Sequence, residues 1–366
     1  MKTKKFAILV GILVFVLAGV SLAQSFHHQK KFSRLIAPHT SILKKAEYRL
    51  KGCKIVHELK DATALSCPGE VKIEDAFEDE VYHIMDLSAD QQINADDVWN
   101  LGYTGKNVAV AVLDTGIDYN HPELNSSFSG CKSFVSYTQD CFDDNGHGTH
   151  VSGIITADGK SINAKGVAPD AQIWIAKVCD ASGSCYVSDI AAAIEYVVNN
   201  KVAKVMNISL GGRGTRLSNC DSDYLAQKVN WAVDNGVTVA AAAGNTAGIV
   251  SSPACASKAI AVGAVDKKDK GANFSGSGLA LDIMAPGVSI YSTLPNNSYA
   301  SWSGTSMATP HVAATIALLL EKNSSLSDAE IKTALYKTAK DLGRAGWDRD
   351  YGWGRVDALG AINYVK

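Results

Sequence analysis

The sequence of 366 residues has little net charge, no internal repeat and no low-complexity segment. Its 35 basic and 37 acidic residues give a formal net charge of −2, which excludes a protein that binds nucleic acid or an anionic membrane through its overall charge. The mean hydropathy of +0.01 excludes a polytopic membrane protein, and the 46% of hydrophobic residues excludes a disordered chain. This leaves a globular chain of one large domain or two smaller ones.

Long apolar runs are also missing, except at the amino terminus. Residues 6–20 are apolar without interruption, follow three lysines and precede Ser21, Leu22 and Ala23. This pattern predicts a secretory signal peptide, residues 1–23, that is cleaved after Ala23. The alternative is an uncleaved signal anchor, because the run is nearly long enough to span a membrane. Export to the extracellular space permits disulfide bonds.

Residues 24–82 differ from the rest of the chain, since they are charged and nearly free of glycine. Two alternating stretches, residues 54–59 and 62–67, predict a β-hairpin, and residues 41–50 have helical periodicity. We therefore expect a small α+β unit ahead of the main domain.

From residue 107 onward, continuous apolar runs alternate with amphipathic segments. Such runs are typical of strands that are buried on both faces, as parallel strands are. The alternation predicts an α/β fold with a doubly wound, mostly parallel sheet. The expected strands are residues 108–113, 172–178, 204–210, 237–243 and 259–265, and the expected helices are residues 147–157, 188–199, 221–234, 306–320 and 327–338.

Polar residues gather where these strands end and helices begin, which is where ligands bind in such a sheet. Asp114 ends a strand, His147 opens a helix, Asn245 follows a strand and Ser306 opens a buried helix. A serine hydroxyl becomes a nucleophile when an imidazole takes its proton, and a carboxylate orients that imidazole. An amide and a helix-terminal N–H can stabilise the oxyanion. Together the four residues predict acyl-transfer chemistry.

Each of these residues also has a simpler interpretation. Asp114 alone would be a turn or helix cap, and Asp118 is a competing carboxylate inside the following turn. His147 and His150 could be a metal pair, but no third ligand follows in a zinc pattern, so we expect no metal there. Ser303 and Thr309 are expected to be capping groups, and His121 and His311 to be structural.

The segments around these residues resemble the subtilase family of serine endopeptidases. The order Asp114, His147, Ser306 is the order found in subtilisin. The resemblance implies that Asp114 orients His147, that His147 is general base and then acid, that Ser306 attacks the substrate and that Asn245 donates to the oxyanion. Further similar stretches extend the resemblance from about residue 90 to the carboxyl terminus: residues 166–169, 206–212 and 352–358.

The resemblance also implies how substrate binds. The substrate backbone would pair with an edge segment, and the residue before the scissile bond would enter a pocket with uncharged walls, so we expect broad endopeptidase activity with an apolar preference. The edge residues are Ser209, Leu210, Gly211 and Gly212, and the pocket residues are Ala242, Ala243, Gly244 and Ser251. A catalytically inactive subtilase fold that only binds peptides is the alternative.

By the same resemblance, residues 24–82 are a propeptide that inhibits the enzyme until autocatalytic cleavage near Tyr82–His83 releases the catalytic domain, residues 83–366. Residues 83–366 contain 22 basic and 28 acidic side chains, so the mature protein is mildly acidic. The expected partners are polypeptide substrates and the protein's own propeptide, with no nucleic acid, and we expect a monomer.

The chemistry needs no cofactor, although subtilases commonly hold structural calcium. The family's strong site uses a Gln, an Asp and an Asn, and this chain has Ile84, Glu123 and Lys160 at those positions. An ammonium group would stand where the cation binds, so we expect that site to be absent. The acidic residues 140, 143 and 144 are either a weak calcium site or a solvated loop.

The eight cysteines are expected to pair, with free buried thiols as the alternative. Three pairs are expected because the two cysteines of each flank one short segment. The fourth is implied by the resemblance, since some subtilases have such a pair. The first three are Cys53 with Cys67, Cys131 with Cys141 and Cys179 with Cys185, and the fourth is Cys220 with Cys255.

Overall fold

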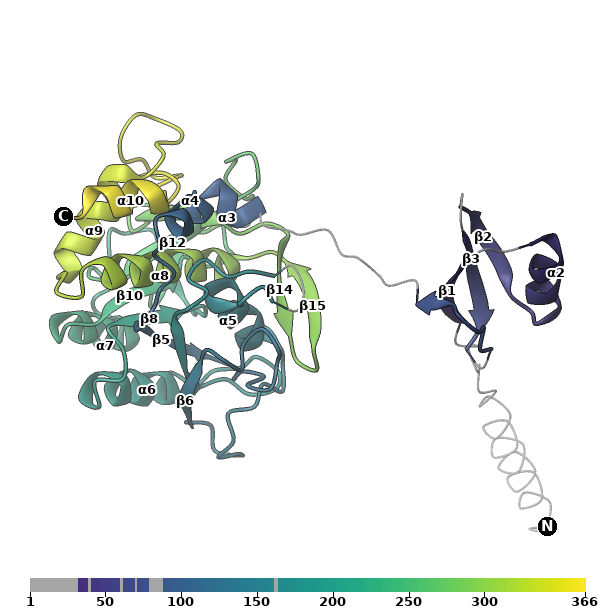
Figure 1. Ribbon diagram of the computed structural model, residues 1–366. Helices are drawn as coiled ribbons and strands as arrows, with labels where there is room; N and C mark the ends of the chain where they lie inside the picture. The colour runs from purple at the N-terminus through teal and green to yellow at the C-terminus, as the bar shows by residue number, and fades with distance from the viewer. Residues whose placement is uncertain (1–31, 39–40, 60–61, 70, 79–87, 161–163) are drawn as a thin grey trace, which may run out of the picture. The chain divides into compact units, whose positions relative to one another are not determined.

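The computed structural model describes residues 32–38, 41–59, 62–69, 71–78, 88–160 and 164–366 (Figure 1). The chain divides into two compact units, residues 1–82 and 83–366. The division falls where the sequence predicts the propeptide to end, and cleavage there remains a prediction. The predicted signal peptide and the Tyr82–His83 bond lie outside the described residues. Within the described ranges, no helix is both long and apolar enough to cross a membrane.

The described part of the amino-terminal unit contains an antiparallel sheet of order β2-β3-β1-β4 and the helix α2. The side chain of Ser41 caps α2 by accepting a hydrogen bond from the Lys44 N–H at 3.3 Å. The predicted hairpin and helix are both confirmed, as β2 with β3 and as α2. The bounds are β1 Phe32–Pro38, α2 Ile42–Leu50, β2 Lys54–Glu58, β3 Ala62–Pro68 and β4 Phe77–Glu78.

The carboxy-terminal unit is built on a seven-stranded sheet of order β13-β12-β10-β8-β5-β7-β6, in which all neighbouring pairs are parallel. This confirms the predicted α/β class, and β5 lies near the centre of the sheet. The strands are β5 Ala109–Asp114, β6 Phe128–Ser133, β7 Gln172–Lys177, β8 Val205–Ile208, β10 Thr238–Ala242, β12 Ile260–Val265 and β13 Ile283–Pro286.

Helices cover both faces of this sheet (Figure 1). In β5, Val110 and Val112 pack in a hydrophobic cluster with α5 and α8, whereas Ala111 and Leu113 pack in a second cluster with α6 and α7. Both sets are fully buried, which explains why the strand is a continuous apolar run. The helices are α3 Ser88–Gln92, α4 Ala95–Asn100, α5 His147–Thr156, α6 Val187–Asn199, α7 Tyr224–Asp234, α8 Thr305–Lys322, α9 Asp328–Thr338 and α10 Ala358–Tyr364.

The sequence patterns missed the two edge strands and misplaced one helix start. The edge strand β6 contains a glycine and is partly exposed, and β13 has only four residues, so neither has a clear period. Helix α7 begins at Tyr224 and not at residue 221, because Asp223 is its N-cap. The Asp223 carboxylate accepts hydrogen bonds from the Leu225 and Ala226 N–H groups, at 3.0 and 3.1 Å. Four short strands were also missed: β9 Gly214–Thr215, β11 Val250–Ser251, β14 Ile290–Leu294 and β15 Ser298–Trp302.

All eight cysteines form disulfides in the described residues, in the four expected pairs. One of them closes the hairpin of the amino-terminal unit. A second joins β6 to the segment that follows it, and a third closes the loop after β7, which borders the predicted site. The pairs are Cys53–Cys67, Cys131–Cys141, Cys179–Cys185 and Cys220–Cys255.

Candidate active site

The predicted catalytic side chains all stand at the ends of elements on the carboxyl side of the sheet. Asp114 is the last residue of β5, and His147 is the first residue of α5. Asn245 lies three residues after β10, and Ser306 is the second residue of α8. The parallel strands therefore bring together residues that are up to 192 positions apart in sequence.

Asp114 and His147 are in direct contact. The Nδ1 atom of His147 lies 2.7 Å from Oδ1 of Asp114, a carboxylate that is only 1% exposed. The Thr115 N–H also donates to this oxygen, at 2.8 Å. Burial lowers the pKa of His147, but the charge and hydrogen bond of Asp114 outweigh it and leave that pKa above its ordinary value. Nε2 of His147 is thus left to act on a reacting group.

A close approach of α5 to β5 makes this contact possible. A Cβ atom on Gly148 would lie 2.1 Å from the Gly116 carbonyl oxygen and 3.1 Å from Cβ of Asp114. Only glycine therefore fits at this position, one residue after His147. In the sequence Gly-His-Gly, packing therefore explains Gly148, whereas chemistry explains the prediction of His147.

The hydroxyl of Ser306 is bound to Ser209, the residue that follows β8. Oγ of Ser306 donates to the Ser209 carbonyl oxygen at 2.9 Å, and Oγ of Ser209 donates to the Ser306 carbonyl oxygen at 2.9 Å. Among the hydrogen bonds of the described residues, none joins Ser306 to His147. Catalytic hydrogen bonds are often absent or long without substrate.

Asn245 is oriented by the start of α8. Its Oδ1 accepts hydrogen bonds from the N–H and the hydroxyl of Thr305, at 3.0 and 3.1 Å. Because the carbonyl end of the amide faces Thr305, the Nδ2 hydrogens are directed away from it. A donor held in this way, beside the nucleophile candidate, suits a developing oxyanion.

A cleft of about 730 Å³ runs beside the Asp114–His147 pair, and its described lining does not include Asn245 or Ser306. Asp114 and His147 border it, and so do all four residues of the predicted edge segment, 209–212. The loop closed by the Cys179–Cys185 disulfide also borders the cleft, and sequence reasoning did not assign it that role. The available signal was its place directly after the carboxyl end of β7.

The chain matches the Subtilase family over residues 105–354, more than half of its length. This chain belongs to the subtilase family. It is 47% identical over 271 residues to subtilisin Savinase of Lederbergia lenta, which covers 74% of this chain and 96% of the relative. It is 47% identical over 271 residues to an alkaline protease of Alkalihalobacillus alcalophilus, covering 74% and 68%, and 44% identical over 276 residues to subtilisin E of Bacillus subtilis, covering 74% and 69%. The chain is thus a subtilisin-like serine endopeptidase, whose substrates are polypeptides.

The predicted pocket residues of this subtilase occupy two kinds of position. Ala242 and Ala243 are buried, and the Ala243 side chain packs in the hydrophobic core, so only its backbone is available to border a pocket. Ser251 lies between two glycines: a Cβ on Gly244 would be 2.1 Å from Oγ of Ser251, and a Cβ on Gly211 would be 3.1 Å from its Cβ. The glycines leave the hydroxyl of Ser251 close to the edge segment.

The competing residues are engaged elsewhere. The Asp118 carboxylate accepts from the N–H groups of Asn120 and Asn296, at 3.0 and 2.9 Å. His150 is buried and stacks on Trp302 at 4.7 Å, and burial lowers its pKa to about 4. Oγ of Ser303 accepts from the Ser289 N–H at 2.8 Å. These contacts give each residue a structural role.

The residues at the family's strong calcium position do not fit a cation. The Lys160 ammonium group lies 2.8 Å from Oδ2 of Asp158, and the Asp158 N–H donates to the carbonyl oxygen of buried Glu123 at 3.1 Å. The positive charge of this exposed side chain, beside these oxygens, disfavours a divalent ion here. Ile84 lies outside the described residues, and within them no group of three acidic, histidine or cysteine side chains is arranged to hold a metal.

We expect a chelator to leave the stability of the mature protein unchanged. In EDTA the melting temperature should move by no more than about 1 °C, whereas loss of a saturated structural ion shifts it by about 10 °C. Scanning calorimetry with EDTA and with added calcium measures this. A fall of many degrees in EDTA would show that oxygen ligands other than those considered bind calcium.

Proposed function

We propose that Asp114, His147 and Ser306 form the catalytic triad of this subtilase, and that peptide bonds are cleaved through an acyl-enzyme. The observation that carries the proposal is the 2.7 Å contact between His147 Nδ1 and the buried Asp114 carboxylate, at the border of the cleft that the edge segment lines. This contact fixes the tautomer in which Nε2 is the base.

The reaction follows from these positions. Nε2 of His147 takes the proton of Ser306 as Oγ attacks the scissile carbonyl, and Asp114 stabilises the imidazolium that forms. The oxyanion accepts hydrogen bonds from Asn245 Nδ2 and from the Ser306 N–H at the start of α8. His147 then gives its proton to the leaving amine, and a water molecule hydrolyses the acyl-enzyme by the same steps in reverse.

At rest the nucleophile is bound to the segment that would receive the substrate. Ser306 Oγ donates to the Ser209 carbonyl oxygen, and strand addition by an extended peptide places N–H groups along residues 209–212. A substrate N–H that occupies the Ser209 oxygen releases the hydroxyl toward His147. Substrate binding and nucleophile activation are thereby connected.

The mature protein is proposed to be a secreted, monomeric enzyme of broad specificity. Residues 242–244 and 251 carry no charge, which supports an apolar preference for the residue before the scissile bond. The unit of residues 1–82 is compact by itself, which supports its role as a cleavable, inhibitory propeptide behind the signal segment. Cleavage of a peptide library only after Arg or Lys would contradict the apolar preference.

A fluorophosphonate distinguishes this function from an inactive peptide-binding fold. It is expected to label Ser306 alone, because the label needs an activated serine beside an oxyanion site. Peptide mapping identifies the labelled residue, and casein hydrolysis should be lost in proportion to labelling. An unlabelled protein that still binds peptides would favour the inactive fold.

Asn245→Ala is expected to lower kcat by about 10²–10³ with little change in KM, a magnitude established for subtilisin. The donor is needed only when charge develops on the oxygen. Asn245→Asp keeps an oxygen for Thr305 but removes the donor, so it should lose at least as much activity. The exposed neighbour is the control, and Thr246→Ala should behave as wild type. Steady-state kinetics on a short peptide checks this, and losses below threefold in both Asn245 variants would remove Asn245 from the oxyanion site.

A further inference from the structure

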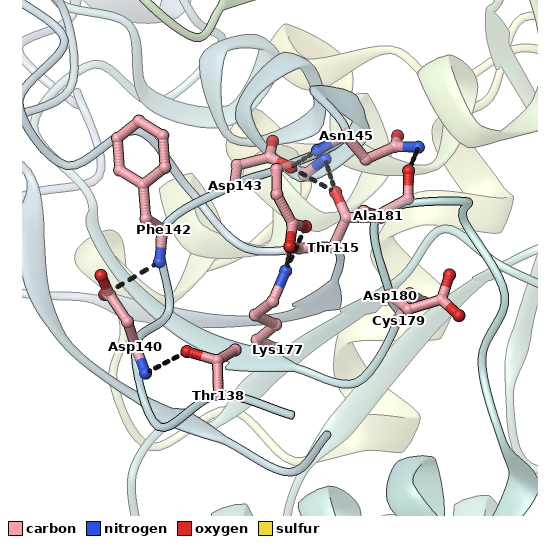
Figure 2. Close-up of polar contacts among 12 residues, drawn as sticks. Thr115, Thr138, Asp140, Phe142, Asp143, Asn145, Lys177, Cys179, Asp180 and Ala181 are labelled. Atoms are coloured by element: carbon pink, nitrogen blue, oxygen red, sulfur yellow. Dashed lines mark hydrogen bonds and ion pairs between the residues drawn. The ribbon is translucent and has the colours of Figure 1, made fainter. Parts of the chain in front are cut away.

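A fully buried lysine, Lys177, contacts the loops around the Asp114–His147 pair and has no part in the chemistry above (Figure 2 labels it). Lys177 is the last residue of β7 and stands beside Asp114 in the parallel register of β5 and β7. Its side chain is 0% exposed. A buried ammonium group is costly unless it is paired and hydrogen-bonded, so its partners are informative.

The ammonium group joins two segments of the chain. It donates to the Thr115 carbonyl oxygen, one residue after Asp114, and to Oδ1 of Asp144 at 2.6 Å. Oδ2 of Asp144 accepts from the Tyr137 hydroxyl at 2.7 Å. Burial raises the pKa of Asp144, but the bonds from Lys177 and Tyr137 outweigh it and lower that pKa, so this carboxylate stays ionised at neutral pH.

The neighbouring carboxylate, Asp143, binds the start of α5. Its Oδ1 accepts from the Gly146 N–H and the Thr115 hydroxyl, both at 2.8 Å (Figure 2 draws the Asp143 and Thr115 side chains). Its Oδ2 accepts from the Thr149 N–H and hydroxyl, at 2.8 and 2.6 Å. Oγ of Thr115 also accepts from the Gly148 N–H at 2.9 Å. Thr115 is therefore held to the segment around His147 by its side chain and, through Lys177, by its carbonyl oxygen.

We propose that Lys177 is a positioning residue for catalysis: its ammonium group clamps the Asp114–Thr115 strand end to the Asp143–Asp144 segment that leads into His147. The inference rests on the triad proposed above. One end of the clamp is one residue from Asp114 and the other is three residues from His147 in sequence, so loss of Lys177 frees the two sides of the Asp114–His147 contact to shift. Displacements of about 1 Å in such a site cost about 10² in rate.

The ammonium group also balances negative charge around the base. The titratable groups that act on His147 are Asp114 at the end of β5, Asp143 before α5 and His150 one turn along α5, and Asp144 follows Asp143 in sequence. Asp143 contributes to the raised pKa of His147. Without Lys177 the carboxylate of Asp144 is uncompensated, and the base becomes harder to deprotonate.

The test is Lys177→Met in the mature enzyme, with active sites counted by fluorophosphonate titration. We expect kcat per titrated site to fall by about 10–100-fold, with KM for a short peptide little changed. The acid limb of kcat/KM should move to higher pH by several tenths of a unit. Asp144→Asn removes the opposite charge and should move the same limb to lower pH. Lys177→Arg keeps the charge and should leave the limb at the wild-type position.

Further variants distinguish positioning from a purely structural role. Lys177→Met with Asp144→Leu removes both charges, so the melting temperature should recover while kcat stays low, because the Thr115 oxygen still lacks its donor. Lys132→Met, at an exposed lysine on the adjacent strand β6, should match wild type. Unchanged kcat per site and an unmoved acid limb in Lys177→Met would overturn the proposal.

Two outcomes keep the test decisive. If Lys177→Met does not fold, the test is made with Asp144→Asn and Lys177→Arg. If the acid limb of Asp144→Asn then coincides with that of wild type, the charge-balancing role is overturned. Every kinetic value is expressed per active site, counted by fluorophosphonate labelling of Ser306, and compared with the wild-type value. Failure of the triad itself would instead appear as an unlabelled wild type.

Discussion

Replacement of Ser306 by alanine is expected to abolish peptide hydrolysis, with kcat lower by about 10⁶, the magnitude established for subtilisin itself. In the proposed mechanism the Ser306 hydroxyl, in the first turn of α8, is the nucleophile. Oxyanion donors and substrate contacts remain in the variant, so residual catalysis over water and an almost unchanged KM are expected. Hydrolysis of casein and of a chromogenic peptide measures both.

A matched serine in the same segment is the control. Ser303 is exposed, and its hydroxyl accepts from the Ser289 N–H on the side away from the triad chemistry. Ser303→Ala should therefore keep wild-type kcat. Equal losses in the Ser303 and Ser306 variants would mean that the segment is needed for folding, and wild-type activity in Ser306→Ala would refute the proposed nucleophile.

The same variant tests how the precursor matures. If the enzyme cleaves itself near residues 82–83, Ser306→Ala should accumulate as a chain that still carries the unit of residues 1–82. Amino-terminal sequencing of both proteins gives the result. Identical amino termini in wild type and variant would assign the cleavage to another protease and would leave the hydrolytic proposal intact.

The sequence predicted the elements that depend on local pattern and on chemistry. β5 was found because both of its faces are buried, so its apolar residues are continuous. Asp114, His147 and Ser306 became candidates because acyl transfer needs those residue types and because strand ends in a parallel sheet meet at one edge. Their geometry, such as the 2.7 Å contact between Asp114 and His147, needed the structure.

What the sequence did not reveal depends on contacts between distant side chains. Lys177 and Asp144 are 33 positions apart, and no local pattern distinguishes a buried ammonium from an exposed one. The acidic residues 143 and 144 were considered as a calcium site or a solvated loop, yet both carboxylates are bound by protein donors. The direction of the Ser306 hydroxyl, toward the Ser209 oxygen, is a rotamer choice that sequence does not encode locally.

Asp114→Asn is expected to lower kcat by about 10⁴ without loss of the fold. An amide has the same shape as the carboxylate, but it carries no negative charge. It therefore does not hold the Nδ1–H of His147 as the carboxylate does. The imidazole can then adopt the tautomer in which Nε2 carries the proton, and it is no longer a base toward Ser306. Asp118→Asn is the matched control, since this buried carboxylate binds only the Asn120 and Asn296 N–H groups among the described residues, and its variant should keep kcat.

The pH profile separates the charge of Asp114 from its role in orientation. His147 must be neutral to act as a base, so kcat/KM falls as the pH drops through its pKa, and Asp114 holds that pKa above the ordinary value. Removing the carboxylate lowers the pKa, so the acid limb of Asp114→Asn should move to lower pH although its plateau is far below that of wild type. The deficit is therefore smaller at low pH, where wild-type His147 is already protonated. An acid limb that stays in place would show that Asp114 orients the imidazole without setting its charge.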